Sequence, residues 1–161
     1  MFTFPVRIYW EDTDAGGIVF YANYLKFMER ARTEWLRSLG ISQQALKQQT
    51  GGMFVVTDTK LKYLLPARLD DVLQVSTQIV EKGRASLTIS QEIRLFPLQN
   101  VHGLLSNQDS PYSDMNSASA KVSDNHDASA LLCQGTICIA WVDCVTLKPG
   151  RMPASISEVL H

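Results

Sequence analysis

Residues 11–39 read EDTDAGGIVFYANYLKFMERARTEWLRSL, and the rest of the chain is organised around them. The stretch opens with a tight acidic turn, Glu11–Gly17, whose two glycines permit backbone conformations that are closed to other residues. A short apolar run, Ile18–Tyr21, leads into the longest helical pattern of the sequence, from about Asn23 to Leu39. We therefore expect the turn to bring its carboxylates back toward the helix N-terminus, where unpaired N–H groups and a partial positive charge lie.

The helical pattern is amphipathic. Its apolar residues recur at helical spacing and form one stripe, made of Tyr24, Phe27, Met28, Ala31, Trp35 and Leu39. Asn23 is a candidate N-cap, and Gly40 follows the pattern at the position where a C′ glycine is common. A stripe with so many large apolar side chains predicts packing against a large apolar surface, most simply a β-sheet.

The remaining segments predict that sheet. Strand-like alternation or β-rich composition marks residues 3–10, 53–64, 71–81, 84–96 and 130–142. In the first of these segments, the alternation predicts that Trp10 lies on the buried face. Gly83 separates two of the segments, as a hairpin requires, and Ser42 is the expected cap of a second, short helix over residues 42–48. One long helix on an antiparallel sheet is an α+β arrangement.

The composition fits one globular domain over residues 1–161, because 45% of the residues are hydrophobic and the chain is long enough to bury a core. Residues 97–129 are rich in Ser, Asn and Asp and show little periodicity, so we expect a polar insertion within that domain. A single helical layer leaves one sheet face and the sheet edges uncovered. This predicts a homo-oligomer.

Charge and spacing argue against several classes of protein. The net charge of −1 gives no electrostatic case for a nucleic-acid or anionic-membrane partner. No apolar run approaches the ~20 residues of a transmembrane helix. The N-terminus lacks the pattern of a secretory signal, so we expect a cytoplasmic protein. The cysteines Cys133, Cys138 and Cys144 lack metal-ligand spacing, and we expect reduced thiols and no metal site.

The acidic turn has three interpretations. Asp12 and Asp14 match the first two ligands of a calcium loop, but Gly16 and Asn23 stand where two further ligands are needed, which argues against calcium. An Asp in a Gly-rich turn often bonds only its own backbone, which is a structural interpretation. A carboxylate near oriented N–H groups in a partly desolvated cleft can also act as a base or nucleophile on a carbonyl. Spacing alone leaves the last two interpretations open.

Other chemistries have weaker support in the sequence. There is no GxSxG elbow, and no Walker or dinucleotide glycine pattern, so we expect no nucleotide cofactor. His102 and His126 lie in the polar insertion, and His161 is the last residue. A mechanism that uses a core histidine is therefore disfavoured, and the acidic side chains of the turn are the best candidates for catalysis.

The segment EDTDAGGIVFYANYLKFMERARTEWL resembles the signature of hotdog-fold acyl-CoA thioesterases. The similarity is to the 4-hydroxybenzoyl-CoA thioesterase superfamily, in particular its Tol-Pal-associated YbgC branch, and it extends to LKYLLPARLDD and DCVTLKPGRMP. It covers most of residues 4–96 and 130–154. The resemblance implies the hotdog fold, a long helix wrapped by an antiparallel sheet, and dimers or tetramers with sites at the subunit interface.

The resemblance also implies the reaction, hydrolysis of an acyl-CoA thioester to a free acid and coenzyme A. Asp14 matches the family's catalytic aspartate, which would activate water or attack the thioester directly. Asp12 matches a supporting, substrate-binding position. The backbone N–H of Tyr21 matches the group that polarises the thioester carbonyl. Close YbgC relatives often carry histidine at this position, whereas the hydroxybenzoyl branch carries tyrosine.

Further contacts with an acyl-CoA substrate are expected from Gly17 of the turn and from the N–H of Ala22. Arg68, Lys82 and Arg84 are candidates for binding the nucleotide phosphates, because cationic side chains favour phosphate. An acyl carrier protein is a further candidate partner. Two alternatives remain, a non-catalytic protein that binds acyl-CoA or acyl carrier protein as a scaffold, and a hotdog dehydratase.

Overall fold

The computed structural model describes residues 1–96 and 130–160, and the predicted insertion at 97–129 lies outside these ranges. The elements, in chain order, are β1 (Phe2–Arg7), the 3-10 turn η1 (Trp10–Asp12), α1 (Asn23–Ser38), α2 (Gln43–Thr50), β2 (Gly52–Tyr63), β3 (Val72–Lys82), β4 (Ser86–Leu95), β5 (Leu131–Asp143) and α4 (Ala154–Ser157).

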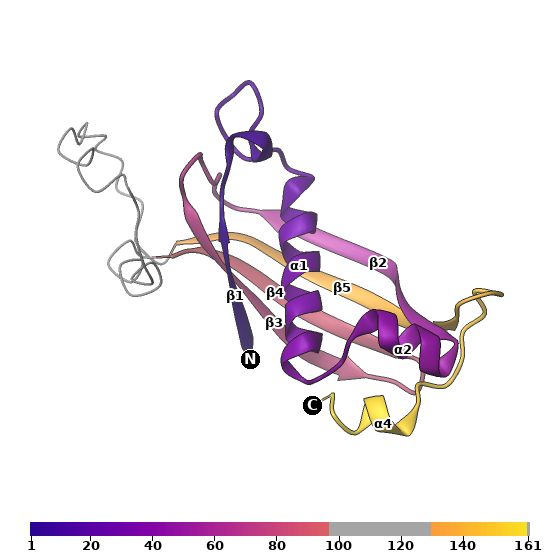
Figure 1. Cartoon of the computed structure of the whole chain (residues 1–161). Coiled ribbons are helices and arrows are strands. Elements are labelled where there is room, and N and C mark those ends of the chain that lie inside the picture. Colours follow the sequence, from indigo (N-terminus) through magenta and orange to yellow (C-terminus); the bar gives the residue numbers. More distant parts are fainter. Residues whose placement is uncertain (97–129, 161) are drawn as a thin grey trace, which may run out of the picture.

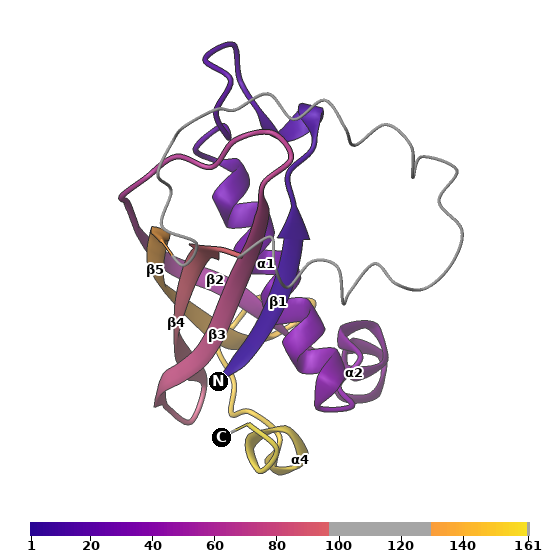
Figure 2. The ribbon, with the colours of Figure 1, turned by 90° about the vertical axis from the view of Figure 1, so that its left-hand side faces the viewer.

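The five strands form one antiparallel sheet in the order β1-β3-β4-β5-β2, and α1 crosses one face of it (Figure 1). The side view shows the curved sheet wrapping the helix (Figure 2). This is the α+β arrangement that the sequence patterns predict and the hotdog architecture that the resemblance implies. Strands β1 and β2 are the edges of the sheet.

The core lies between α1 and the sheet. The predicted stripe is confirmed at Phe27, Met28 and Ala31, which are fully buried, whereas Leu39 is only half-buried. Gly135 of β5 lets the helix approach closely. A Cβ at that position would lie 2.5 Å from the Leu61 side chain and 3.1 Å from Met28.

A buried polar network joins α1 to the sheet. Gln91 of β4 is fully buried, and its amide donates to the Met28 carbonyl at 3.1 Å and to the Thr77 hydroxyl at 3.0 Å. The Arg32 guanidinium donates to the Gln91 carbonyl oxygen at 2.7 Å. Burial lowers the pKa of Arg32. Because each buried polar atom of Gln91 has a partner, the network does not carry the cost of unsatisfied groups.

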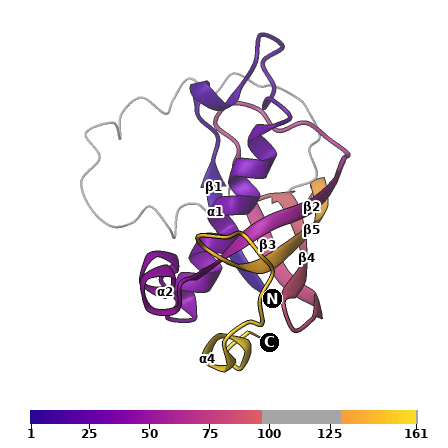
Figure 3. The ribbon, with the colours of Figure 1, turned by 90° about the vertical axis from the view of Figure 1, so that its right-hand side faces the viewer.

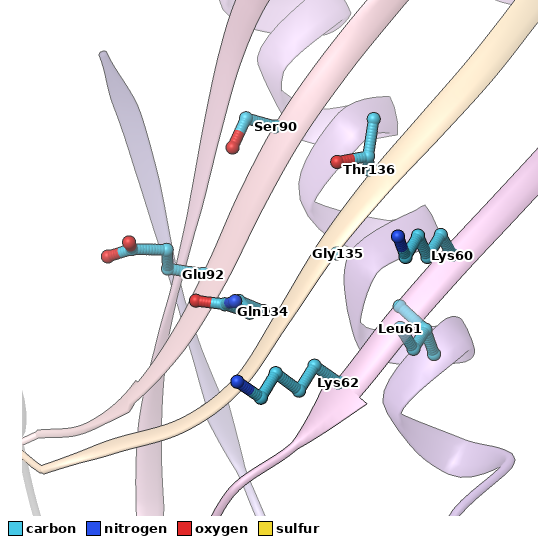
Figure 4. Close-up of a pocket in the computed structure, with 8 residues that line it drawn as sticks. All are labelled: Lys60, Leu61, Lys62, Ser90, Glu92, Gln134, Gly135 and Thr136. Carbon is cyan, nitrogen blue, oxygen red and sulfur yellow. The ribbon is translucent and has the colours of Figure 1, made fainter.

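The opposite face of the sheet is polar. Figure 4 shows the side chains that project from this face, on the side of the sheet away from α1. They line a hollow of about 390 Å³. The polar lining residues come from β2, β4 and β5, and are Lys60, Lys62, Ser90, Glu92, Gln134 and Thr136. They are cross-strand neighbours on one face. An antiparallel sheet with such a face can lie against water, so the face itself does not require a cover.

Two local predictions at the start of the chain are wrong. Trp10 is 78% exposed, because β1 ends at Arg7 and the chain then turns through η1. The Asp12 carboxylate stabilises that turn by accepting the Tyr9 N–H at 3.0 Å. Asn23 is the first residue of α1 and not its N-cap, which is Ala22.

The helix ends and the hairpin follow the sequence more closely. Gly40 has φ of 78° and donates to the Arg37 carbonyl, while the Ile41 N–H donates to the Leu36 carbonyl, both at 2.9 Å. These bonds form a Schellman motif. The Ser42 hydroxyl caps α2. Gly83 closes the predicted β3–β4 hairpin by donating to the Ser86 carbonyl at 2.8 Å.

Candidate active site

The acidic turn is a small closed loop fastened to the β2–β3 connection. The Asp14 N–H donates to the Ile18 carbonyl at 2.9 Å, and the Gly17 N–H donates to the Asp14 carbonyl at 3.0 Å. Gly17 has φ of 73°, a conformation that favours glycine. The Val19 N–H then donates to the Ala67 carbonyl at 2.8 Å. These bonds fix the turn against a segment more than forty residues away in the chain.

The Asp14 carboxylate is exposed and is held by its own turn. Its Oδ1 accepts the Gly16 N–H at 2.7 Å. A Cβ on Gly16 would lie 3.1 Å from the same oxygen, which is a tight contact, so glycine lets the carboxylate approach without a shift. Within the described ranges, Oδ2 of Asp14 accepts no hydrogen bond. The carboxylate therefore has a defined orientation and one oxygen open to water or substrate.

Asp12 serves the structure of the site. Its carboxylate is buried at 6% exposure and bonds the Tyr9 N–H. Its main-chain carbonyl accepts the Phe20 N–H at 2.9 Å and the Asn23 side-chain amide at 3.0 Å. Asp12 and Asn23 together hold the acidic turn beside the first residue of α1.

The start of α1 presents backbone donors. The Phe20 carbonyl accepts the Asn23 N–H at 2.9 Å, and the Ala22 carbonyl accepts the Leu25 N–H at 3.2 Å. In the part of the chain that the structure describes, the N–H groups of Tyr21 and Ala22 bond no backbone carbonyl. The helix dipole adds a partial positive charge at the same end of α1. The arrangement suits an oxygen that gains negative charge.

An apolar pocket of about 230 Å³ adjoins these donors. Its lining residues come from the end of the turn, the start of α1, the end of β2 and the segment that follows β2. They are Ile18, Val19, Tyr21, Tyr24, Tyr63, Leu64, Leu65 and Pro66. The Tyr24 hydroxyl accepts the Ala67 N–H at 2.9 Å, and burial raises the pKa of Tyr24. The Tyr63 hydroxyl donates to the Tyr21 carbonyl at 3.1 Å.

The predicted cationic residues separate into two places. Arg68 lies beside the turn, where it pairs with Ile18 in an isolated β-bridge. Lys82 and Arg84 lie at the β3–β4 hairpin, at the opposite end of the sheet (Figures 1 and 3). The β3 strand has 11 residues, so at ~3.3 Å per residue the separation along it is about 35 Å. One chain does not bring these two residues to Asp14.

At the hairpin, the Lys82 ammonium donates to the Ser157 carbonyl at 2.8 Å and to the Leu160 carbonyl at 2.9 Å. It thereby holds the C-terminal turn α4 against the sheet. Lys82, Arg84 and Arg151 line a groove of about 680 Å³ there.

Sequence reasoning missed the tyrosine cluster of Tyr21, Tyr24 and Tyr63. The Tyr63 and Tyr24 rings are 5.5 Å apart edge to face, and Tyr63 meets Tyr21 at 6.4 Å. Tyr63 is the last residue of β2, and the alternation along that strand does not indicate a contact with a residue 42 positions earlier in the chain. No local signal could have revealed the contact.

The described ranges hold neither a membrane-spanning helix nor a cluster of metal ligands. Within residues 1–96 and 130–160, no helix combines the length and the apolar character needed to cross a bilayer. Over the same ranges, no three histidine, cysteine or acidic side chains gather closely enough to ligate a metal ion.

Comparison with known proteins identifies the family. The family model "Thioesterase superfamily" matches residues 16–99. The acyl-CoA thioesterase YbgC of Haemophilus influenzae is 34% identical over 160 residues, which are 99% of this chain and 94% of that protein. The acyl-CoA thioester hydrolase YbgC of Escherichia coli is 50% identical over 93 residues, which are 58% of this chain and 69% of that protein. The chain therefore belongs to the thioesterase superfamily, in its YbgC branch.

A solved structure supports the fold. Slr0204, a 1,4-dihydroxy-2-naphthoyl-CoA thioesterase from Synechocystis, superposes with a TM-score of 0.74 at 17% identity, covering 99% of this chain and 94% of that one.

Proposed function

We propose that the protein hydrolyses an acyl-CoA thioester to a free acid and coenzyme A. The observation that carries this proposal is the arrangement at the start of α1. There the turn that orients the Asp14 carboxylate leads directly into the segment that carries the N–H groups of Tyr21 and Ala22, and Tyr21 lines an apolar pocket. The names of the YbgC relatives support the same activity.

In the proposed mechanism, the thioester carbonyl accepts hydrogen bonds from the Tyr21 and Ala22 N–H groups. Asp14 removes a proton from water as the water oxygen attacks the carbonyl carbon, and the oxyanion is stabilised by the two donors. Loss of one such donor typically costs ~3 kcal/mol of transition-state stabilisation. Collapse of the intermediate breaks the C–S bond, and the coenzyme A thiolate takes up a proton. Direct attack by Asp14 would instead give a mixed anhydride, which water then hydrolyses.

The acyl group would enter the apolar pocket at the tyrosine cluster, and Gly17 would border its entrance. Asp12 supports the site through the turn. We propose that Arg68 meets the nucleotide phosphates, and its position in the segment bonded to the turn supports this role.

We propose a homo-oligomer, a dimer or tetramer, for which the sheet edges β1 and β2 are the candidate interfaces. Lys82 and Arg84 are about 35 Å along β3 from the turn. They could therefore contact nucleotide phosphates only if the substrate is bound to a second copy of the chain.

The free thiols of Cys133, Cys138 and Cys144 fit a reducing, cytoplasmic location. One domain over 1–161, with the insertion at 97–129, remains our proposal for the whole chain, and an acyl carrier protein remains a candidate partner.

A panel of acyl-CoA thioesters of increasing chain length, followed by thiol detection, tests the activity. We expect release of coenzyme A from at least one member. Tight binding of the panel without thiol release would contradict hydrolysis and favour a scaffold. Hydration of an enoyl-CoA without thiol release would favour the dehydratase.

A further inference from the structure

Tyr63 makes a contact that the reaction scheme above does not use. It is the last residue of β2, and its hydroxyl donates to the Tyr21 carbonyl at 3.1 Å. The Tyr24 ring, 5.5 Å away at 73°, and the Tyr21 ring, 6.4 Å away at 86°, both meet it edge to face. The phenol is therefore oriented by two neighbouring rings. Burial raises the pKa of Tyr63, which keeps the hydroxyl protonated as a donor.

The accepting carbonyl belongs to the same peptide unit as the Ala22 N–H. A peptide unit is planar, so its C=O and N–H point in opposite directions, and fixing one fixes the other. The carbonyls on either side, those of Phe20 and Ala22, accept backbone N–H groups of α1. The Tyr21 carbonyl is bonded by the Tyr63 hydroxyl instead. A hydrogen bond to the carbonyl also polarises the unit and strengthens its N–H as a donor.

We propose that Tyr63 is a positioning residue that aims and polarises the Ala22 N–H toward the oxygen of the bound acyl group. The proposal rests on the proposed function, because it takes the carbonyl to lie at the start of α1. Tyr63 contacts no reacting atom in this scheme. Its hydroxyl acts through the Tyr21–Ala22 peptide unit.

A purely structural role is the competing explanation. In that case the hydroxyl only fastens the end of β2 to the start of α1, and its removal lowers stability without changing the chemistry. Tyr63 is 46% exposed, so a hydrogen bond at this position contributes little to folding. An experiment can therefore distinguish the two roles, because only the positioning role predicts that removal of the hydroxyl changes the polarisation of the bound carbonyl.

Tyr63→Phe tests the proposal, since it keeps the ring and deletes the hydroxyl. Tyr9→Phe is the matched control, because it deletes the same atom from a tyrosine that is 60% exposed and outside the tyrosine cluster. We expect Tyr63→Phe to lower kcat about tenfold, less than the ~10²–10³ for outright loss of an oxyanion donor. KM and the melting temperature should stay at the wild-type values.

A spectroscopic readout does not depend on turnover. The probe is an acyl-CoA analogue in which CH₂ replaces the thioester sulfur, with ¹³C at the ketone carbonyl. We expect its carbonyl stretch to shift to lower frequency on binding to wild type and to Tyr9→Phe, and to shift less on binding to Tyr63→Phe. Equal shifts in all three proteins would overturn the positioning role, whatever happens to kcat.

The same experiments distinguish failure of the proposed hydrolysis from failure of the proposed role of Tyr63. If wild type binds the ketone but releases no thiol from the acyl-CoA panel, hydrolysis is wrong, and the carbonyl shifts still decide the role of Tyr63. If the ketone does not bind to wild type, both proposals are wrong.

Discussion

Gly16→Ala should slow thioester hydrolysis about fourfold and leave the fold intact. The new Cβ would lie 3.1 Å from Oδ1 of Asp14, and ordinary contact begins at 3.4 Å, so the carboxylate must move by about 0.3 Å. A misplacement of about 1 Å can cost ~10²-fold in rate, so about 0.3 Å corresponds to roughly 0.6 log units, or about fourfold. Alanine also lowers the conformational entropy of the unfolded chain, which stabilises the folded state by ~0.4–1 kcal/mol. This gain offsets the destabilising effect of the tight contact.

The assay is kcat from thiol release with the best acyl-CoA of the panel, together with the melting temperature. Gly150→Ala is the matched control, because its Cβ would meet only Trp141, at 4.0 Å, beyond the end of β5 that is remote from the turn. We expect Gly150→Ala to retain the wild-type kcat. A Gly16→Ala protein with both wild-type kcat and wild-type stability would refute the reasoning, since the position of the Asp14 carboxylate would then not matter.

Two further predictions concern the core. Gln91→Leu should lower the free energy of unfolding by ~3 kcal/mol, because it removes the hydrogen bond to the half-buried Arg32 guanidinium and leaves the Thr77 hydroxyl without the Gln91 amide. Urea denaturation measures this change, and a loss below about 1 kcal/mol would contradict the role of the network. Burial raises the pKa of Cys133 to about 11, so at about pH 8 only about one thiol in a thousand is ionised. Mass-spectrometric mapping of alkylation should find Cys133 slower than Cys138, and this difference should shrink as the pH approaches the raised pKa.

Most of the fold follows from local patterns in the sequence. Helical spacing gives α1 and its buried residues Phe27 and Met28, and alternation gives the strands, because these periods follow directly from backbone geometry. Trp10 shows the limit of alternation. The pattern runs on past Arg7, but the chain leaves the sheet because the Asp12 carboxylate bonds the Tyr9 N–H.

The site was less predictable because its contacts are distant in sequence. Asn23 has the chemistry of an N-cap, yet its amide bonds the Asp12 carbonyl 11 residues earlier. Lys82 and Arg84 have the charge to bind phosphate, but the antiparallel path of β3 carries them to the end of the sheet opposite the turn. Tyr63 gives no signal by itself, because its role depends on how the end of β2 meets the start of α1.

The exposed Asp14 carboxylate is the centre of the proposed mechanism, and its removal is the most direct test. Single-turnover hydrolysis should be measured for wild type, Asp14→Asn and Glu11→Gln, each checked for a wild-type melting temperature. Glu11 is the control, because it is an exposed carboxylate in the same turn. We expect Asp14→Asn to be slower by ~10²-fold or more, the usual contribution of a general base, and Glu11→Gln to react at the wild-type rate. Hydrolysis by folded Asp14→Asn at the wild-type rate would contradict the mechanism.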